Sequence, residues 1–118
     1  MMKKTVIMRA AGKTWELCFT IRSLAAFERS IGKSVISLFS GGIVHMVEQM
    51  DIDATIAGLK YALSISEDEA YNVADEVCAG GKNLDYINGQ IIHAIRATGL
   101  FEPMAENEEA EEKAVGKP

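Results

Sequence analysis

The segment from Thr14 to Leu38 constrains the fold more than any other part of the chain, because its hydrophobic period changes within a few residues. Its sequence is TWELCFTIRSLAAFERSIGKSVISL. Over residues 14–20 apolar side chains alternate with polar ones, which predicts a strand, and from residue 21 they recur at three- and four-residue spacing, which predicts a helix. A strand that leads directly into a helix favours an α+β domain.

The strand is expected to form a hairpin with the segment before it. Residues 5–10 also alternate, and Ala11-Gly12-Lys13 has the composition of a turn. Trp15, Leu17 and Phe19 share one face of the second strand. Two strands alone are marginal in water, so helices must cover this apolar face.

About five helices are expected to cover the hairpin. Thr20 is the predicted N-cap of a helix over residues 21–31 that ends at Gly32, and a short helix over residues 35–39 follows Ser34. Residues 43–52 fit either a short helix or an extended segment. Asp53 is the predicted N-cap of the next helix, which continues to Leu63.

The last two helices have clear start signals. Ser66 and Glu69 form a predicted capping box for a helix that ends at Gly80. Asn83 is the predicted N-cap of the last helix, whose wide apolar arc predicts that it is the most buried of all. It is expected to stop at Gly99.

The charge divides the chain into a single domain, residues 1–101, and an acidic tail, residues 102–118. The domain holds eleven acidic and ten basic residues, whereas the tail holds six glutamates and two lysines. Because the tail has low hydrophobicity and clustered charge, we expect it to be disordered. The tail would repel a phosphate backbone and no basic stripe compensates for it, so nucleic-acid binding is not expected.

The sequence predicts no catalytic site, cofactor, metal or small-molecule substrate. Cys18 and Cys78 are isolated and are expected to be reduced and buried. His45 and His93 have no partner at metal-ligand spacing, and His93 is expected to be a partly buried packing residue. No apolar run reaches membrane-spanning length. The N-terminus is basic, but Arg9, Lys13 and Glu16 follow too soon for the apolar core of a signal peptide, which favours the cytoplasm.

The clearest candidate for a binding surface is the apolar patch of Ile43, Met46, Val47 and Met50. Met46 and Met50 are four residues apart and would share one face of a helix. Flexible thioethers suit adaptable binding surfaces, but they also fill gaps in cores. Both a partner-facing patch and core packing are therefore open interpretations.

Several short motifs resemble the tail assembly chaperones of long, flexible-tailed bacteriophages and of related prophages and gene-transfer agents. The resemblance covers roughly residues 5–101 and predicts a helical body after the N-terminal motif. The motifs are Gly12-Lys13, Trp15-Glu16-Leu17, Phe19-Thr20-Ile21, Leu24, Phe27-Glu28, Gly32-Lys33-Ser34, Leu38, residues 56–63 and residues 97–101.

The resemblance implies a non-enzymatic chaperone in the cytoplasm of the host bacterium that is absent from the mature virion. Such proteins coat the long tape measure protein, keep it soluble and help to recruit tail tube subunits. Coating a long rod implies self-association of many copies. The tail glutamates, which are expected to tune recruitment, are Glu106, Glu108, Glu109, Glu111 and Glu112.

In this family a longer form often arises by ribosomal frameshifting near the end of the gene. Such slippage is common at codons for a Gly-Lys pair, and Gly116 and Lys117 form such a pair near the end of this chain. The resemblance therefore implies a frameshifted longer form of this chain, which the nucleotide sequence would reveal through a slippery heptamer and an overlapping reading frame.

Two other functions stay open from the sequence. One is a different small cytoplasmic adaptor or inhibitor module, which would share the acidic tail and the lack of catalytic motifs. The other is a small enzyme whose groups converge only in three dimensions. A deep pocket lined by Cys18, His45 or His93 with neighbouring carboxylates would favour the enzyme.

Overall fold

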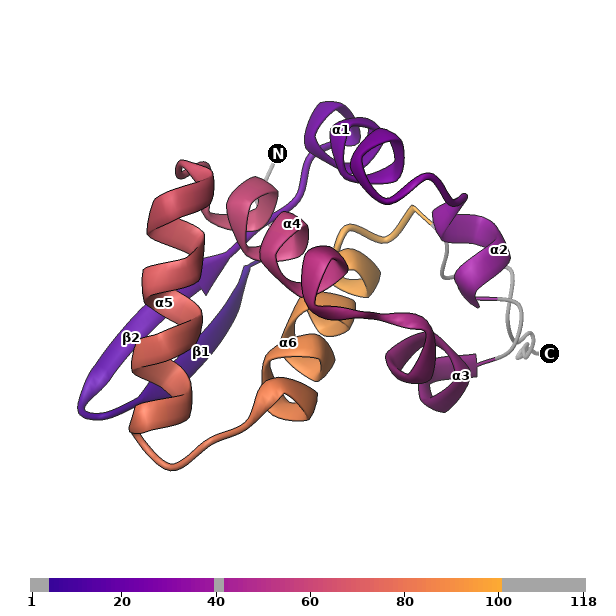
Figure 1. Ribbon diagram of the computed structural model, residues 1–118. Coiled ribbons are helices and arrows are strands. Elements are labelled where there is room, and N and C mark those ends of the chain that lie inside the picture. Colours follow the sequence, from indigo (N-terminus) through magenta and orange to yellow (C-terminus); the bar gives the residue numbers. More distant parts are fainter. Residues whose placement is uncertain (1–4, 40–41, 101–118) are drawn as a thin grey trace, which may run out of the picture.

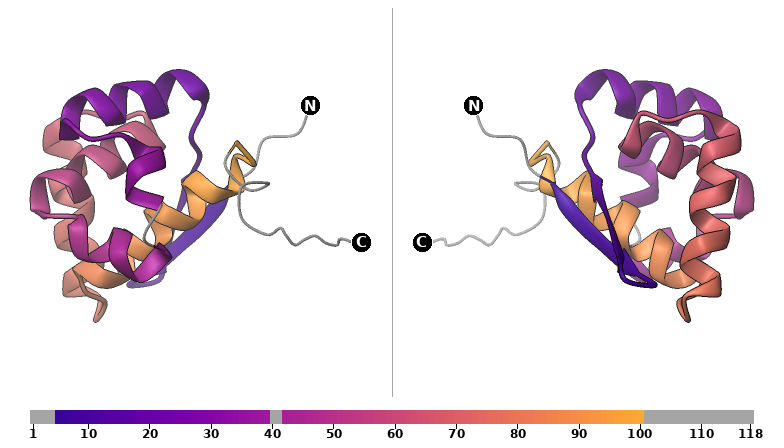
Figure 2. Two further views of the ribbon diagram at one scale, coloured as in Figure 1. Left: turned by 90° about the vertical axis from the view of Figure 1, so that its right-hand side faces the viewer. Right: turned by 90° about the vertical axis from the view of Figure 1, so that its left-hand side faces the viewer.

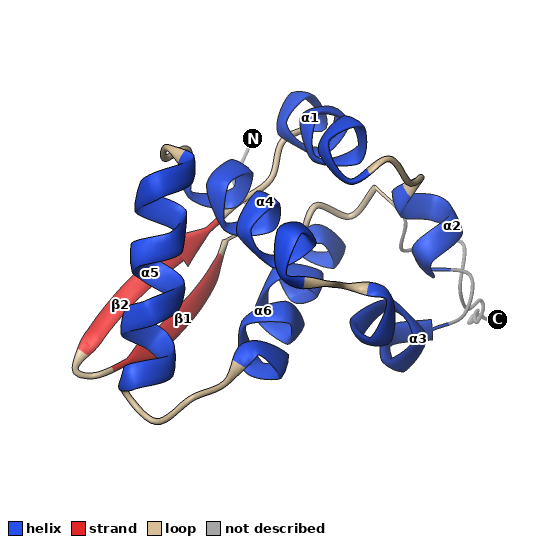
Figure 3. Ribbon diagram, in the orientation of Figure 1, coloured by secondary structure: helices blue, strands red, loops and turns tan. Residues whose placement is uncertain are grey.

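The computed structural model describes residues 5–39 and 42–100, which form an α+β domain with an N-terminal hairpin and six helices (Figure 1 and Figure 3). The predicted fold class is confirmed, with one helix more than expected. The predicted acidic tail lies outside the described residues. The elements in chain order are β1 Val6–Ala10, β2 Lys13–Leu17, α1 Ile21–Ile31, α2 Val35–Phe39, α3 Gly42–Gln49, α4 Ile52–Leu63, α5 Glu67–Ala79 and α6 Leu84–Ala97.

The hairpin has one buried face, as the alternation of its residues predicts. β1 and β2 pair antiparallel in a register that places Met8 opposite Trp15. Met8 and Leu17 are fully buried and Trp15 is partly buried, whereas Thr14 and Glu16 on the other face are exposed. The hydrophobic effect therefore holds this face against the helices.

The hairpin turn packs against the end of α5. Ala11 and Gly12 both have positive φ, 54° and 75°, which is the conformation of the two-residue turns that match strand twist. A Cβ on Gly80, at the end of α5, would lie 2.9 Å from the backbone nitrogen of Ala11. Beside this contact Lys13 forms a salt bridge with Glu76 of α5.

Tyr86 of α6 binds the outer edge of β1. Its hydroxyl accepts a hydrogen bond from the backbone N–H of Arg9 at 3.0 Å and donates one to the carbonyl of Arg9 at 3.2 Å. Both views in Figure 2 show α6 running alongside the hairpin, which is consistent with this contact. One side chain thus satisfies backbone groups that an edge strand otherwise leaves to water.

Local capping signals decide where α1 and α5 begin, as predicted. The Thr20 hydroxyl accepts from the N–H of Ser23 at 3.1 Å, and the Ser23 hydroxyl accepts from the N–H of Thr20 at 2.8 Å. Ser66 and Glu69 make the same reciprocal pair at 3.1 and 3.0 Å. Gly32 ends α1 with φ of 71°, a left-handed conformation that glycine adopts without a steric penalty.

The prediction for the start of α4 is wrong by two residues. Asp51, not Asp53, is the N-cap: its backbone is extended and its carboxylate accepts from the N–H of Ala54 at 2.8 Å. Asp53 lies in the first turn instead. Of the segment 43–52, for which the sequence left helix and extended chain open, residues 43–49 belong to α3.

α4 occupies the centre of the domain, between the hairpin with α5 on one side and α2 with α3 on the other (Figure 1). It contacts α1, α5, α6 and β2. Seven of its twelve residues are buried, against six of fourteen in α6, so the prediction that the last helix is the most buried is wrong. The buried residues of α4 are Ala54, Thr55, Ile56, Ala57, Gly58, Leu59 and Ala62.

Within the described ranges, no helix combines the length and the apolar character that crossing a bilayer requires.

Candidate interaction site

The predicted apolar patch of α3 is divided between core and surface. Met46 is 0% exposed, so it is a core residue and its assignment as a partner contact is corrected. Val47 and Met50 are partly buried against the core, and the side chain of Ile43 lies outside what the structure describes. α3 packs on α2 and α6, and this packing decides which face of the helix is inside.

The exposed apolar side chains are different ones. Val44 is 72% exposed because it lies two residues, about 200° around the helix, from Met46. Ile21, Ile36 and Ile52 are 70%, 61% and 58% exposed. In the sequence these four residues cannot be told from core residues by their aliphatic side chains alone. On α2 Ile36 is exposed, whereas Val35 and Leu38 are buried.

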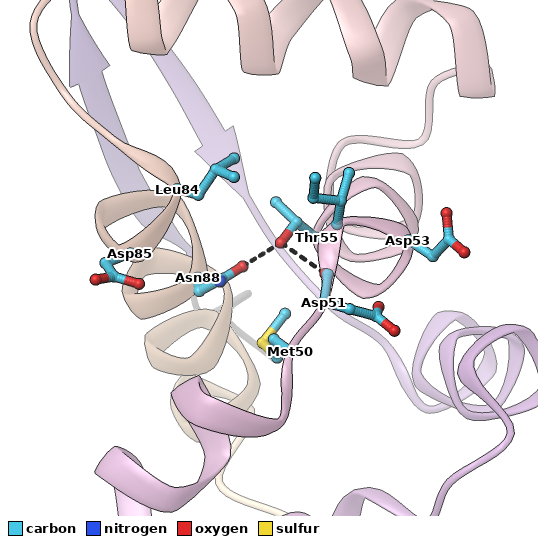
Figure 4. Close-up of a pocket in the computed structure, with 8 residues that line it drawn as sticks. Met50, Asp51, Asp53, Thr55, Leu84, Asp85 and Asn88 are labelled. Atoms are coloured by element: carbon cyan, nitrogen blue, oxygen red, sulfur yellow. Dashed lines mark hydrogen bonds between the residues drawn. The ribbon is translucent and has the colours of Figure 1, made fainter.

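A cleft of about 530 Å³ lies between the start of α4 and the start of α6 (Figure 4). We call it the α4–α6 cleft. It is lined by Met50, Asp51, Ile52, Asp53, Thr55, Leu84, Asp85 and Asn88. Met50 is therefore the residue of the predicted patch that lies in a hollow of the surface.

Two helix N-termini place the carboxylates of the α4–α6 cleft. Asp51 caps α4, and Asp53 lies in its first turn. Asn83 caps α6 by accepting from the N–H of Tyr86 at 2.8 Å, and Asp85 lies in the first turn of that helix. Negative side chains are stabilised at helix N-termini, so each of these carboxylates also has a structural role.

A buried polar pair forms the inner wall of the α4–α6 cleft. The Thr55 hydroxyl lies 2.5 Å from Oδ1 of Asn88 and 3.1 Å from the carbonyl oxygen of Asp51. Thr55 and Asn88 are 1% and 3% exposed. Figure 4 shows the two side chains pointing toward each other from α4 and α6, with Asp53 and Asp85 at the outer sides.

A smaller hollow of about 130 Å³ adjoins the α4–α6 cleft, since Met50, Asp51 and Asp53 line both. Its other lining residues come from the end of α1, from α2, from the end of α3 and from the start of α4, together with Lys33 between α1 and α2. The lining residues of the two hollows carry three carboxylates and one amine.

The cysteines and histidines line neither hollow. Cys18 is half-buried. Cys78 is exposed, so the prediction that it is buried is wrong. His45 and His93 are both exposed, so the expectation that His93 is partly buried is wrong. Over residues 5–39 and 42–100, no three histidine, cysteine or acidic side chains are grouped so that they could hold a metal ion.

The predicted recruitment residues Glu106, Glu108, Glu109, Glu111 and Glu112 lie outside the described residues, as do Gly116 and Lys117.

Comparison with protein-family models, with curated proteins and with solved structures finds no match to this chain.

Proposed function

We propose that this chain is a non-enzymatic phage tail assembly chaperone that binds and solubilises the tape measure protein and helps to recruit tail tube subunits. One observation carries the proposal: exposed aliphatic side chains lie on the surface of the segment that resembles this family. Ile21, Ile36, Val44 and Ile52 each keep more than half of their surface in water. Burial of such a side chain by a partner contributes about 1.5–3 kcal/mol.

The packing of the motif residues supports the proposal. Leu17, Phe19, Leu24, Phe27 and Leu38 of the motif are all buried. The rings of Phe19 and Phe27 are 5.9 Å apart between centroids, a separation typical of packed aromatic pairs. The motif residues thus pack into the core, and Ile21 of α1 and Ile36 of α2 stay exposed.

A chaperone with this surface would act on a polymer that exposes apolar faces. Under the proposal, several copies bind along the tape measure protein in the cytoplasm of the host bacterium, and none stays in the mature virion. Aliphatic contacts supply the affinity, while the acidic tail opposes association between coated assemblies. A longer, frameshifted form of the chain remains part of the proposal.

Co-expression with the tape measure protein of the same locus tests the proposal. The chain is expected to increase the soluble fraction of that protein and to co-purify with it. Val44→Ser is expected to weaken both effects, whereas His45→Ser, the neighbouring exposed residue on α3, serves as the control. A tape measure protein that stays insoluble with and without the chain would contradict the proposal.

The gene neighbourhood gives an independent check. A tail tube gene upstream and a very long tape measure gene downstream are expected. A locus without virion genes would instead favour a different adaptor or inhibitor module, which would use the same exposed aliphatic side chains on another partner.

A further inference from the structure

We propose that the outer edge of β2 is a dimer interface, at which the β2 strands of two copies of the chain pair antiparallel and make a four-stranded sheet. The inference specifies a contact between copies, whereas the proposed function concerns a contact with the tape measure protein. It is tested on the purified chain alone, so its failure and the failure of the proposed function are distinguishable.

The backbone groups of β2 that point out of the hairpin follow from the contact of Tyr86. Its hydroxyl binds both the N–H and the carbonyl of Arg9, so both groups of Arg9 point away from β2. Arg9 is paired with Thr14. In an antiparallel ladder both residues of such a pair point their backbone groups outward, and this arrangement recurs at every second pair. The N–H and carbonyl groups of Thr14 and Glu16 therefore point to the outer edge of β2.

The outer edge of β2 is free between the hairpin turn and the end of α4. Over residues 5–39 and 42–100, no hydrogen bond joins the backbone of Thr14 or Glu16 to a residue outside the hairpin. At the next outward position, the N–H of Cys18 donates to the carbonyl of Ala62 at 3.0 Å. Figure 1 shows β2 on the side of the hairpin that faces away from α6. The edge thus offers two N–H and two carbonyl groups to a strand of a partner.

The length of the free edge favours a second β2 over a long extended strand of another protein. A long strand would continue past Leu17 to the position where Ala62 already binds Cys18. A second β2 has the same five residues. When it runs antiparallel, its Lys13 lies opposite Leu17, and beyond Lys13 its own hairpin turn leads the chain away from the interface.

The side chains of β2 select one register. A two-fold axis at Trp15 places Thr14 of each copy opposite Glu16 of the other, which allows four hydrogen bonds between the backbones. An axis at Glu16 would place two like charges directly opposite each other, which is destabilising, and would need the N–H of Cys18, which is already bound. An axis at Thr14 would place Glu16 opposite Gly12 in the turn and leave two hydrogen bonds.

Trp15 adds an apolar contact in this register. Its side chain is partly buried against the core, on the face of β2 opposite to Thr14 and Glu16. The two Trp15 residues form a non-hydrogen-bonded pair, the kind in which directly opposite side chains approach most closely. Packing of the two indoles would remove from water the part of each ring that the core leaves exposed.

The interface is small, so the dimer is expected to be in equilibrium with the monomer. Pairing of two five-residue strands buries less area than a stable complex requires, and the net charge of −5 opposes association. We expect a dissociation constant between about 1 μM and 1 mM. Sedimentation equilibrium of the full chain over this range of concentration measures it. A chain that stays monomeric throughout would overturn the proposal.

Trp15 is the only tryptophan of the chain, so it reports on the two-fold axis. Two indoles in contact produce an exciton couplet in the circular dichroism spectrum. The couplet is expected to increase with concentration in parallel with the fraction of dimer. A dimer that forms without the couplet has its interface elsewhere and refutes the pairing.

An exchange of charges tests the register. Thr14→Glu places glutamates opposite each other across the interface and is expected to weaken the dimer about fivefold or more. Thr5→Glu is the matched control, because it adds the same charge at an exposed position before β1, and it is expected to change the dissociation constant less than about twofold at moderate salt. Thr14 is exposed as well, so neither change is expected to affect folding.

The double variant Thr14→Glu with Glu16→Lys should restore the dimer, because both cross-strand contacts become Glu–Lys pairs. Sedimentation equilibrium compares it with Thr14→Glu alone. Equal effects of Thr14→Glu and Thr5→Glu would contradict the interface, and a double variant as weak as Thr14→Glu would contradict the register.

Discussion

Gly58 lies where α4 and α6 pack directly against each other, and its missing side chain allows their close approach. A Cβ atom there would lie 2.7 Å from Cδ1 and 2.9 Å from Cγ2 of Ile91, closer than the usual carbon–carbon separation of about 3.5–4.0 Å. Ile91 is fully buried, so its side chain has little room to move. The glycine is therefore required for packing between the helices.

We expect Gly58→Ala to destabilise the protein and Gly89→Ala to stabilise it. Overpacking at Gly58 costs about 1–3 kcal/mol, which exceeds the gain of about 1 kcal/mol in helix propensity. Gly89 is also helical, but a Cβ atom there would meet nothing within 4 Å beyond the backbone of its own helix, so only the propensity gain remains. Urea unfolding of both variants checks this, and shifts of the same sign would contradict it.

At the scale of single elements, the helix starts that follow from the sequence are those set by neighbours in the chain. Thr20, Ser66 and Asn83 were all predictable as N-caps, because a cap needs only a side chain and a backbone N–H three residues later. The start of α4 was not predictable, since Asp51 and Asp53 both have a side-chain acceptor and a backbone N–H three residues later. The extended backbone at Asp51 and the hydrogen bond that its carboxylate accepts from the N–H of Ala54 distinguish the two.

Substitution of the two aspartates distinguishes the cap from the first-turn position. Asp51→Ala removes the acceptor for the N–H of Ala54 and is expected to lower the free energy of unfolding by about 1 kcal/mol. Asp53→Ala loses only a favourable interaction with the helix dipole, about 0.3–1 kcal/mol. Asp51→Asn keeps the cap and should be close to wild type. Thermal unfolding measures all three, and a larger loss for Asp53→Ala would contradict the assignment.

The contact between α6 and β1 gives a second prediction at this scale. Tyr86→Phe removes both hydrogen bonds to the Arg9 backbone, and we expect a loss of about 1–2 kcal/mol at this partly solvated position. Tyr71→Phe on α5 is the control, because its hydroxyl has no hydrogen bond in the described part of the chain. Amide hydrogen exchange in β1 should increase only in the Tyr86 variant. Unchanged exchange there would argue against the edge contact.

At the scale of the whole molecule, tertiary packing determines what the sequence pattern leaves open. The central position of α4 was not predictable, because Ala57 and Gly58 give little hydrophobic signal although they are buried. The α4–α6 cleft combines residues about thirty positions apart, such as Thr55 and Asn88. Met46 and Val44 differ in exposure only because α3 packs in one orientation. Such features follow from contacts between elements and have no local sequence signal.

The buried core supports a last prediction at this scale, that the acidic tail does not contribute to folding. The core cluster extends from Met8 to Ile95 and joins the hairpin to all six helices. Residues 103–118 contain few large apolar side chains, so they offer little surface for burial. Deletion of residues 103–118 is expected to change the melting temperature by less than about 2 °C, since a change of 1 kcal/mol would shift it by several degrees.

The same deletion separates folding from assembly if the tail has its proposed role. Thermal unfolding of the truncated chain measures stability, and co-purification of tail tube subunits measures recruitment. Deletion removes five glutamates that are expected to tune recruitment, Glu106, Glu108, Glu109, Glu111 and Glu112. A matched variant that replaces the five with glutamine keeps the length and removes their charge. If truncation lowers the melting temperature and the glutamine variant does not, the tail packs on the domain, and its length rather than its charge contributes to stability.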